Sequence, residues 1–304
     1  MKLFLSCFLF LFFSSLKAQK TLQEKLGYAK DAKLLIIHAD DLGVSHSENE
    51  ASTNAMEKGL VSSGSIMVPT PWFPEIAAYS QTHPEADLGL HLTLTSEWKY
   101  LKWSPVANKT EVPKLMNQNG FMFSAVDSVL MSSNAQEVEA ELRAQIEKAK
   151  LFGVDFTHFD SHMGSLYAKP DFLQVMIKLG HEYKVPVMLN GLILQANKII
   201  ANDARDIVID SIYVENPSDY KTGTALFYTK ILKAIKPGVH LIILHAAYND
   251  REMQGVAIEH PDYGAAWRQA DFDFFTGEAC KALLTKNNIH VITWREIREK
   301  VVRK

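Results

Sequence analysis

Short apolar runs alternate with amphipathic stretches along most of the chain. Four consecutive aliphatic residues, Leu34 to Ile37, predict a first buried strand. The later apolar runs are of similar length and are often followed by Gly or Pro, which favours strands over buried helices. We predict strands over residues 34–38, 64–68, 88–94, 157–162, 185–189, 206–210, 239–245 and 289–293.

Helical periodicity occupies most of the segments between these strands. The clearest example is residues 135–152, which are rich in Ala, Glu and Lys and are followed by Gly153. We predict helices over residues 46–59, 74–80, 135–152, 171–183, 222–235, 265–285 and 294–302. This alternation predicts an α/β fold, a single distorted (β/α) barrel of seven or eight strands over residues 19–304; an open doubly wound sheet is the alternative.

Residues 96–121 interrupt this rhythm. They contain Trp98, Tyr100 and Trp103 and have no clear period. A loop of this length in a compact domain is usually functional or disordered, and its aromatic content argues against disorder. The rings either hold the loop in place or form a wall on which a sugar stacks, and the sequence leaves both interpretations open.

The first 18 residues have the pattern of an export signal. Lys2 precedes an apolar run over residues 3–13, and Ala18 is a plausible cleavage point. The run is too short for a transmembrane helix, so we expect no membrane span. We therefore predict a signal peptide over residues 1–18 and a periplasmic or secreted mature protein.

Composition excludes some classes of function. The 304 residues are 47% hydrophobic and 22% charged, with a formal net charge of −3. Such a charge provides no basic surface for a nucleic acid, so no nucleic-acid partner is expected. Of two cysteines, Cys7 lies in the predicted signal and only Cys280 remains, which leaves no internal disulfide. We expect Cys280 to be packed rather than reactive.

Polar residues stand where several predicted strands end. The carboxyl ends of barrel strands converge on one rim, where active sites form. Histidine and carboxylate ligands from several strands suit a catalytic divalent metal with three protein ligands and one open position. The residues concerned are Asp40, Asp41, His91, His158, Asp160, His162 and His245.

Each of these residues also has a structural interpretation. A single buried histidine such as His91 is more often a hydrogen-bonded core residue than a ligand. The Asp40–Asp41 pair could form a turn or cap the next helix. We expect His158 to pack in the wall, and His38 is ambiguous. The shared position at one rim favours a functional site.

Four segments together resemble the YdjC-like carbohydrate deacetylases. They are His-Ala-Asp-Asp-Leu-Gly at 38–43, Leu-Gly-Leu-His-Leu at 88–92, Thr-His-Phe-Asp-Ser-His at 157–162 and Leu-His-Ala-Ala-Tyr at 244–248. The resemblance extends from about residue 33 to residue 297, nearly the whole mature chain. It implies a distorted barrel of the polysaccharide deacetylase type that removes acetyl groups from N-acetylated amino sugars with a divalent metal.

The resemblance also implies roles for individual residues. Asp41, His91 and His162 would bind the metal. Asp40 would be the general base and His245 the general acid. The resemblance points to Mg²⁺, whereas imidazole-rich ligation favours Zn²⁺.

The chain departs from the family pattern at two places. Gly164 stands where the family often has histidine, and Ala246 follows His245 where the family often has proline. These differences affect the substrate contacts and the position of His245. We further predict that Asp160 and His158 orient His162.

The expected partner is a small carbohydrate substrate, and a homodimer is compatible with the sequence. Two alternatives remain. One is an exported sugar-binding protein that has lost catalysis, for which the altered segment after His245 is the main support. The other is a metal-dependent hydrolase of a different ester or amide on the same barrel.

Overall fold

The computed structural model describes residues 20–304, and its strands pair in parallel throughout. The main sheet has the order β4-β3-β2-β1-β8-β7, with β9 beside the start of β1, and β5 and β6 form a separate pair. The strands are β1 (Lys33–Leu42), β2 (Ser63–Ile66), β3 (Leu88–Leu92), β4 (Phe159–Ser161), β5 (Leu189–Asn190), β6 (Val208–Ile209), β7 (Ser211–Val214), β8 (Gly238–Leu244) and β9 (Ile289–Val291).

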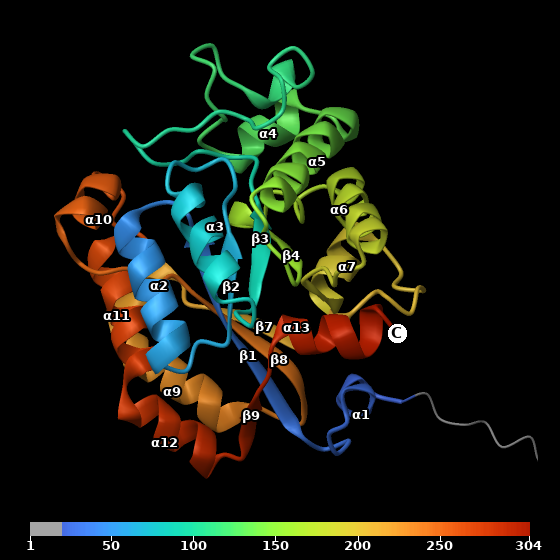
Figure 1. Ribbon diagram of the computed structural model, residues 1–304. Helices are drawn as coiled ribbons and strands as arrows, with labels where there is room; N and C mark the ends of the chain where they lie inside the picture. The colour runs from blue at the N-terminus through green and yellow to red at the C-terminus, as the bar shows by residue number, and fades with distance from the viewer. Residues whose placement is uncertain (1–19) are drawn as a thin grey trace, which may run out of the picture.

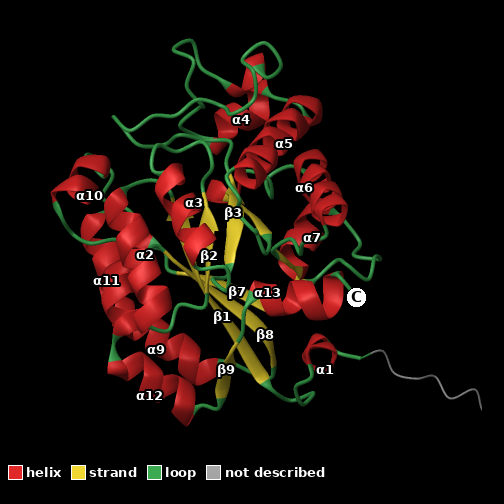
Figure 2. Ribbon diagram, viewed as in Figure 1, coloured by secondary structure: helices red, strands yellow, loops and turns green. Residues whose placement is uncertain are grey.

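Helices cover the outside of this curled sheet (Figures 1 and 2). Helices α2, α9, α11 and α12 pack on one side, and α5 packs against α6 on the other. The helices are α1 (Leu22–Leu26), α2 (His46–Lys58), α3 (Phe73–Thr82), α4 (Val126–Ser132), α5 (Ala135–Leu151), α6 (Pro170–Tyr183), α7 (Gly191–Asn197), α8 (Pro217–Thr222), α9 (Thr224–Ala234), α10 (Arg251–Val256), α11 (Ala265–Thr276), α12 (Glu278–Lys286) and α13 (Trp294–Ile297), with short η1 (Pro113–Leu115), η2 (His162–Gly164) and η3 (Arg298–Val302).

The prediction of a single distorted α/β barrel is confirmed. Phe159 of β4 forms a parallel bridge with Val187, so the β5–β6 pair continues the curve beyond β4. Several details of the prediction are wrong. Strand β7 and the helices α1, α4, α7, α8 and α10 were not predicted, and the helix expected over 265–285 is divided at Gly277.

The sheet separates two apolar cores. Alternate residues of a strand face opposite sides, and β1 shows the effect clearly. Leu35 and Ile37 join the large core beneath the helices, whereas Leu34 and Ile36 join a smaller core inside the curve. The inward residues of the strands therefore fill the interior, and those at the carboxyl ends of the strands form the site.

The long segment after β3 is held against α5 by buried side chains. The carboxylate of Glu141 accepts hydrogen bonds from the backbone N–H groups of Val106 and Ala107, each at 2.9 Å. Gln145 accepts from the N–H of Thr93 and donates to its carbonyl. These contacts satisfy backbone groups that a buried loop would otherwise leave unpaired.

In the described part of the chain, no helix combines the length and apolar character needed to cross a membrane. The predicted signal peptide lies outside the described residues. Cys280 is buried, as expected, and burial raises the pKa of its thiol to about 12. This keeps the sulfur protonated and unreactive.

Candidate active site

An irregularity in β1 turns two adjacent carboxylates into the same cavity. Ala39 pairs with Gly64 but Leu42 pairs with Ile66, so β1 has one residue more than β2 over this stretch. Asp41 absorbs the difference with a left-handed backbone, φ 68°. Neighbouring residues of a regular strand would face opposite sides. Because of the bulge, Asp40 and Asp41 both line the cavity.

The three predicted metal ligands meet at the bottom of that cavity. His91 comes from β3 and His162 directly follows β4. Asp41 Oδ1 lies 3.4 Å from His91 Nε2 and 3.2 Å from His162 Nδ1. All three side chains are at most 4% exposed. The structure thus brings together Asp41, His91 and His162 from three strands.

The donor set fits a divalent metal. Ligand bonds of about 2.0–2.2 Å at tetrahedral angles place neighbouring ligand atoms roughly 3.3–3.6 Å apart, close to the distances found here. Asp41 Oδ1 is buried and accepts no well-aligned hydrogen bond from any described residue. A buried carboxylate oxygen without a donor is costly unless a cation meets it.

Each of the two imidazoles also bonds a carboxylate through its other nitrogen. His91 Nδ1 lies 2.7 Å from Asp160 Oδ1, and His162 Nε2 lies 2.9 Å from Glu97 Oε2. Such carboxylates fix the ring orientation of metal-binding histidines. The predicted orientation of His162 by Asp160 is therefore wrong, because Glu97 contacts His162. No periodic pattern marks Glu97, which lies in the long segment after β3.

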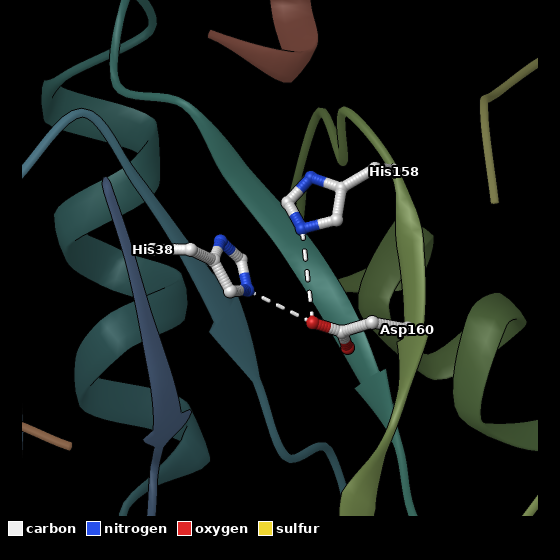
Figure 3. A group of neighbouring side chains, drawn as sticks. All are labelled: His38, His158 and Asp160. Atoms are coloured by element: carbon white, nitrogen blue, oxygen red, sulfur yellow. Dashed lines mark hydrogen bonds and ion pairs between the residues drawn. The ribbon is translucent and has the colours of Figure 1, made fainter. Parts of the chain in front are cut away.

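Asp160 also connects His91 to His38, and Figure 3 shows its contact with His38. His38 Nε2 lies 2.8 Å from Asp160 Oδ2 and 3.0 Å from Asp40 Oδ1. Burial alone would lower the pKa of His38, but Asp160 and Asp40 outweigh it and raise the pKa to about 9. His38 is thus a buried cation between two carboxylates, a role that its position in the sequence left ambiguous.

His158 is part of the wall, as its packing interpretation expects. Its ring stacks on Trp294, and Thr157 Oγ1 lies 2.9 Å from its Nδ1. Its Nε2 is 4.0 Å from Asp160 Oδ2, the longer dashed line in Figure 3. Burial and the nearby charge of His38 hold the pKa of His158 well below its usual range. His158 is therefore a neutral packing residue.

Arg268 and Glu48 complete the charge pattern, and sequence reasoning missed both. Arg268 of α11 donates to Asp41 Oδ2 at 2.9 Å and also contacts the Glu48 carboxylate. Burial would raise the pKa of Asp41, but Arg268, His162 and His91 hold it well below its usual range. Asp41 is therefore ionised and ready to bind a cation.

His245 reaches the site from the end of β8. Its Nε2 lies 3.9 Å from Asp41 Oδ2, and its side chain is 16% exposed. Burial and then the charge of Arg268 outweigh Asp41 and lower the pKa of His245 to about 4. The imidazole is consequently neutral at neutral pH. It can act as a general acid only after it has received a proton.

The cavity above these residues has a volume of about 700 Å³. Of the three aromatic residues for which the sequence left a sugar wall and a loop-holding role open, Trp98 lines the cavity. Tyr100 is 70% exposed on the surface, whereas Trp103 is buried and its Nε1 donates to the Thr95 carbonyl. Two of the three rings therefore hold the loop or face solvent, and one faces the site.

A parallel α/β barrel with histidine and carboxylate donors at its strand ends is typical of metal-dependent hydrolases. The family model of the YdjC-like proteins matches residues 34–286, and the chain belongs to this family. The predicted family membership is confirmed.

Curated relatives agree with this assignment. A carbohydrate deacetylase of Thermus thermophilus is 29% identical over 285 residues, which cover 91% of this chain and 98% of the relative. A carbohydrate deacetylase of Brevibacillus brevis is 29% identical over 268 residues, 86% of this chain and 99% of the relative. These relatives agree with the sequence prediction of a carbohydrate deacetylase.

A solved structure has the same fold. It comes from Enterococcus faecalis V583 and is described as a cellobiose-phosphate cleavage protein. It superposes with a TM-score of 0.73 at 22% identity and covers 88% of this chain and 99% of its own. At this identity the likeness establishes the architecture alone.

Proposed function

We propose that this protein is a metal-dependent carbohydrate deacetylase that hydrolyses the acetamide of N-acetylated amino sugars. The carrying observation is the convergence of Asp41, His91 and His162 around Asp41 Oδ1, a buried carboxylate oxygen that accepts no well-aligned hydrogen bond from the described residues. Asp40 stands beside this donor set in the same cavity. A sugar-binding protein would not need this arrangement.

Asp41, His91 and His162 would hold the metal. When bound, a divalent ion polarises the amide carbonyl and makes a water molecule more acidic. Two imidazoles and one carboxylate favour Zn²⁺ on chemical grounds, whereas the family resemblance points to Mg²⁺. The proposal is therefore a divalent metal site, and the experiment below distinguishes the two ions.

Asp40 is the proposed general base. Its Oδ1 accepts from Ser65 at 3.2 Å and lies 3.0 Å from His38, which fixes the carboxylate in one orientation. Its Oδ2 lies 3.7 Å from His91 Nε2 and faces the donor set. A carboxylate held beside the metal, but not needed as a ligand, is placed to remove a proton from the attacking water.

His245 is the proposed proton donor to the departing nitrogen, which is too basic to leave as an anion. Because the pKa of this imidazole is lowered to about 4, His245 would carry the proton only transiently. A donor that releases its proton readily is effective once it has been loaded. The route by which Asp40 and His245 exchange that proton passes through the cavity that both line.

Two further proposals concern the whole protein. The pattern of residues 1–18 supports export, with a mature chain that begins near residue 19. The homodimer compatible with the sequence is tested by sedimentation of that mature chain.

The test is acetate release by residues 19–304 from N-acetylated chito-oligosaccharides. The metal-stripped protein is compared with protein restored with Mg²⁺, Zn²⁺ or Co²⁺, and bound metal is measured in parallel. His162→Ala should lose both metal and turnover. Asp40→Asn should keep the metal but lose turnover by about 10²–10⁴-fold.

The outcomes separate the alternatives. Unchanged turnover in Asp40→Asn would rule out Asp40 as the base. No acetate release with any metal, together with retained sugar binding, would favour the sugar-binding protein. Neither release nor binding would direct the search to another ester or amide.

A further inference from the structure

The interior of the barrel is polar on one half and aliphatic on the other. Leu34 and Ile36 of β1 belong to the apolar core below the site. Toward the strand ends, the inward residues of β1 to β4 and of the turns that follow carry charged and hydrogen-bonding groups, including His38, Ser63, Ser65, His91, Asp160 and His162. The inward residues around β5 to β8 are aliphatic and include Met188, Ile207, Ile209, Val239 and Leu241. The site thus lies on a boundary between two chemically different walls.

The aliphatic half continues upward into the cavity. Ile212 and Val214 of β7, Ile243 of β8 and Ile193 of α7 all line it, and we call these four residues the aliphatic wall. Val214 pairs with Ile243 across the strands. Val214 is 40% exposed, and the other three residues are partly buried. These side chains present apolar surface that the fold itself does not cover.

Ile212 and Ile243 of the aliphatic wall lie deeper in the barrel than the proposed proton donor, whereas Val214 is the last residue of β7 and Ile193 lies in α7, beyond the end of β5. Ile243 precedes His245 by two residues and faces the same side, so it is about 7 Å further from the rim at roughly 3.3 Å per residue. Polar groups mark the opposite direction. Asp262, Tyr263 and His260 line the cavity from the segment after α10, and Asp262 is exposed to solvent.

This arrangement orients an N-acyl amino sugar. Sugar hydroxyls placed against Ile212 and Ile243 would lose water without gaining hydrogen-bond partners, which is unfavourable. The same hydroxyls would have polar groups nearby at Asp262 and Tyr263. A sugar bound in this way would extend toward the rim, and the group on the other side of the amide would point toward the aliphatic wall.

We propose that the aliphatic wall binds an unbranched N-acyl chain longer than acetyl. This inference rests on the proposed deacylation and names its preferred substrate class. In the reaction the amide C–N bond breaks, the oxygen of water joins the acyl carbon to give a carboxylate, and the nitrogen leaves as the protonated amine. No further reactant is needed.

The wall leaves room for such a chain. Strand β7 is an edge of the main sheet, and β5 and β6 form a separate pair beside it. The cavity is lined from both sides of this junction, by Met188 and Asn190 near β5 and by Val214 of β7. The cavity, about 700 Å³ in volume, continues along the wall to Met188 and Asn190, so an acyl chain along the wall would remain inside it.

The test compares N-acetyl-, N-butyryl- and N-hexanoylglucosamine as substrates of the metal-loaded mature protein, with amine release as the readout. A fully buried methylene contributes a factor of about four, so butyryl should exceed acetyl in kcat/KM by about fourfold or more. Val214→Thr adds a hydroxyl to the wall and should lower the butyryl-to-acetyl ratio. Val208→Thr is the matched control, because Val208 is a similarly exposed strand residue, 37%, that does not line the cavity.

Each outcome decides a different statement. Hydrolysis of the acetyl substrate with a kcat/KM for butyryl that does not exceed the value for acetyl would overturn the inference and leave the deacetylase intact. An unchanged ratio in Val214→Thr would also overturn it. The hexyl glycoside of N-acetylglucosamine gives the third comparison: a gain for this compound alone would assign the wall to an aglycone. No hydrolysis of any amide would refute the proposed function itself.

Discussion

Replacement of Arg268 by methionine tests the charge balance beneath the site. Arg268 is 2% exposed and donates to Asp41 Oδ2 at 2.9 Å, to the Glu48 carboxylate and to the Tyr263 carbonyl. Methionine keeps much of the side-chain length and removes the charge. The substitution therefore isolates the electrostatic contribution of a single buried guanidinium.

The two carboxyl groups that contact Arg268, those of Asp41 and Glu48, differ in their protonation. Arg268 contacts both buried carboxyl groups, and a buried carboxyl that shares a cation with a second anion favours its protonated form. Burial, opposed by Arg268 but reinforced by Asp41, raises the pKa of Glu48 well above its usual range. Asp41 has its pKa held well below the usual range. Glu48 is therefore neutral, and Arg268 pairs with ionised Asp41.

The expected magnitudes follow from this assignment. Charges about 4 Å apart at an effective dielectric constant of 20 attract by about 4 kcal/mol. Loss of one partner of a buried pair costs about 3–5 kcal/mol, and we expect this decrease in the free energy of unfolding for Arg268→Met. Glu48→Gln replaces a neutral side chain by a neutral one of similar shape and should cost less than about 1 kcal/mol.

Urea unfolding at pH 7, followed by tryptophan fluorescence, measures both variants. A chelator removes any contribution from bound metal, which would otherwise stabilise the folded state. The reasoning fails if Arg268→Met costs less than about 1 kcal/mol, since a buried pair would then contribute no more than a surface pair. It also fails if Glu48→Gln is as costly as Arg268→Met, because Glu48 would then be ionised.

Three further predictions use other parts of the structure. Glu97→Gln should weaken metal binding by about 10–100-fold through His162; a competition titration that shows equal affinity would contradict the contact. Burial raises the pKa of Glu141 from 4.5 to about 7. Between these values the folded state holds a proton that the unfolded chain has released, so stability falls as pH rises, by at most about 1.4 kcal/mol per pH unit. Urea titrations should lose this slope in Glu141→Gln, and an identical pH profile would refute it. Gly89→Ala would place a methyl group against the His158 ring and should lower Tm, whereas Gly191→Ala, with open space around it, should not; equal Tm values would count against the close packing.

The site residues differ in how far the sequence could predict them. His91, His162 and His245 stand at the ends of apolar strands, where polar groups are unusual, and the barrel rule brings such ends together. Glu97 has no comparable signal. It lies in an aperiodic segment, and its contact with His162 depends on how α5 holds that segment through Glu141.

The order of strands and helices, the strand ends and the four motif segments were determined by the sequence itself, because hydrophobic periodicity and local turn residues act over a few positions. Contacts between distant residues were decided only by the tertiary structure. The bulge at Asp41 exists because β1 and β2 differ by one residue in register, and Arg268 meets Asp41 from a helix more than 200 positions away. The aliphatic wall likewise depends on β7, a short strand. Which of its residues face inward is decided by its pairing with β8. Packing, rather than periodicity, selects these neighbours.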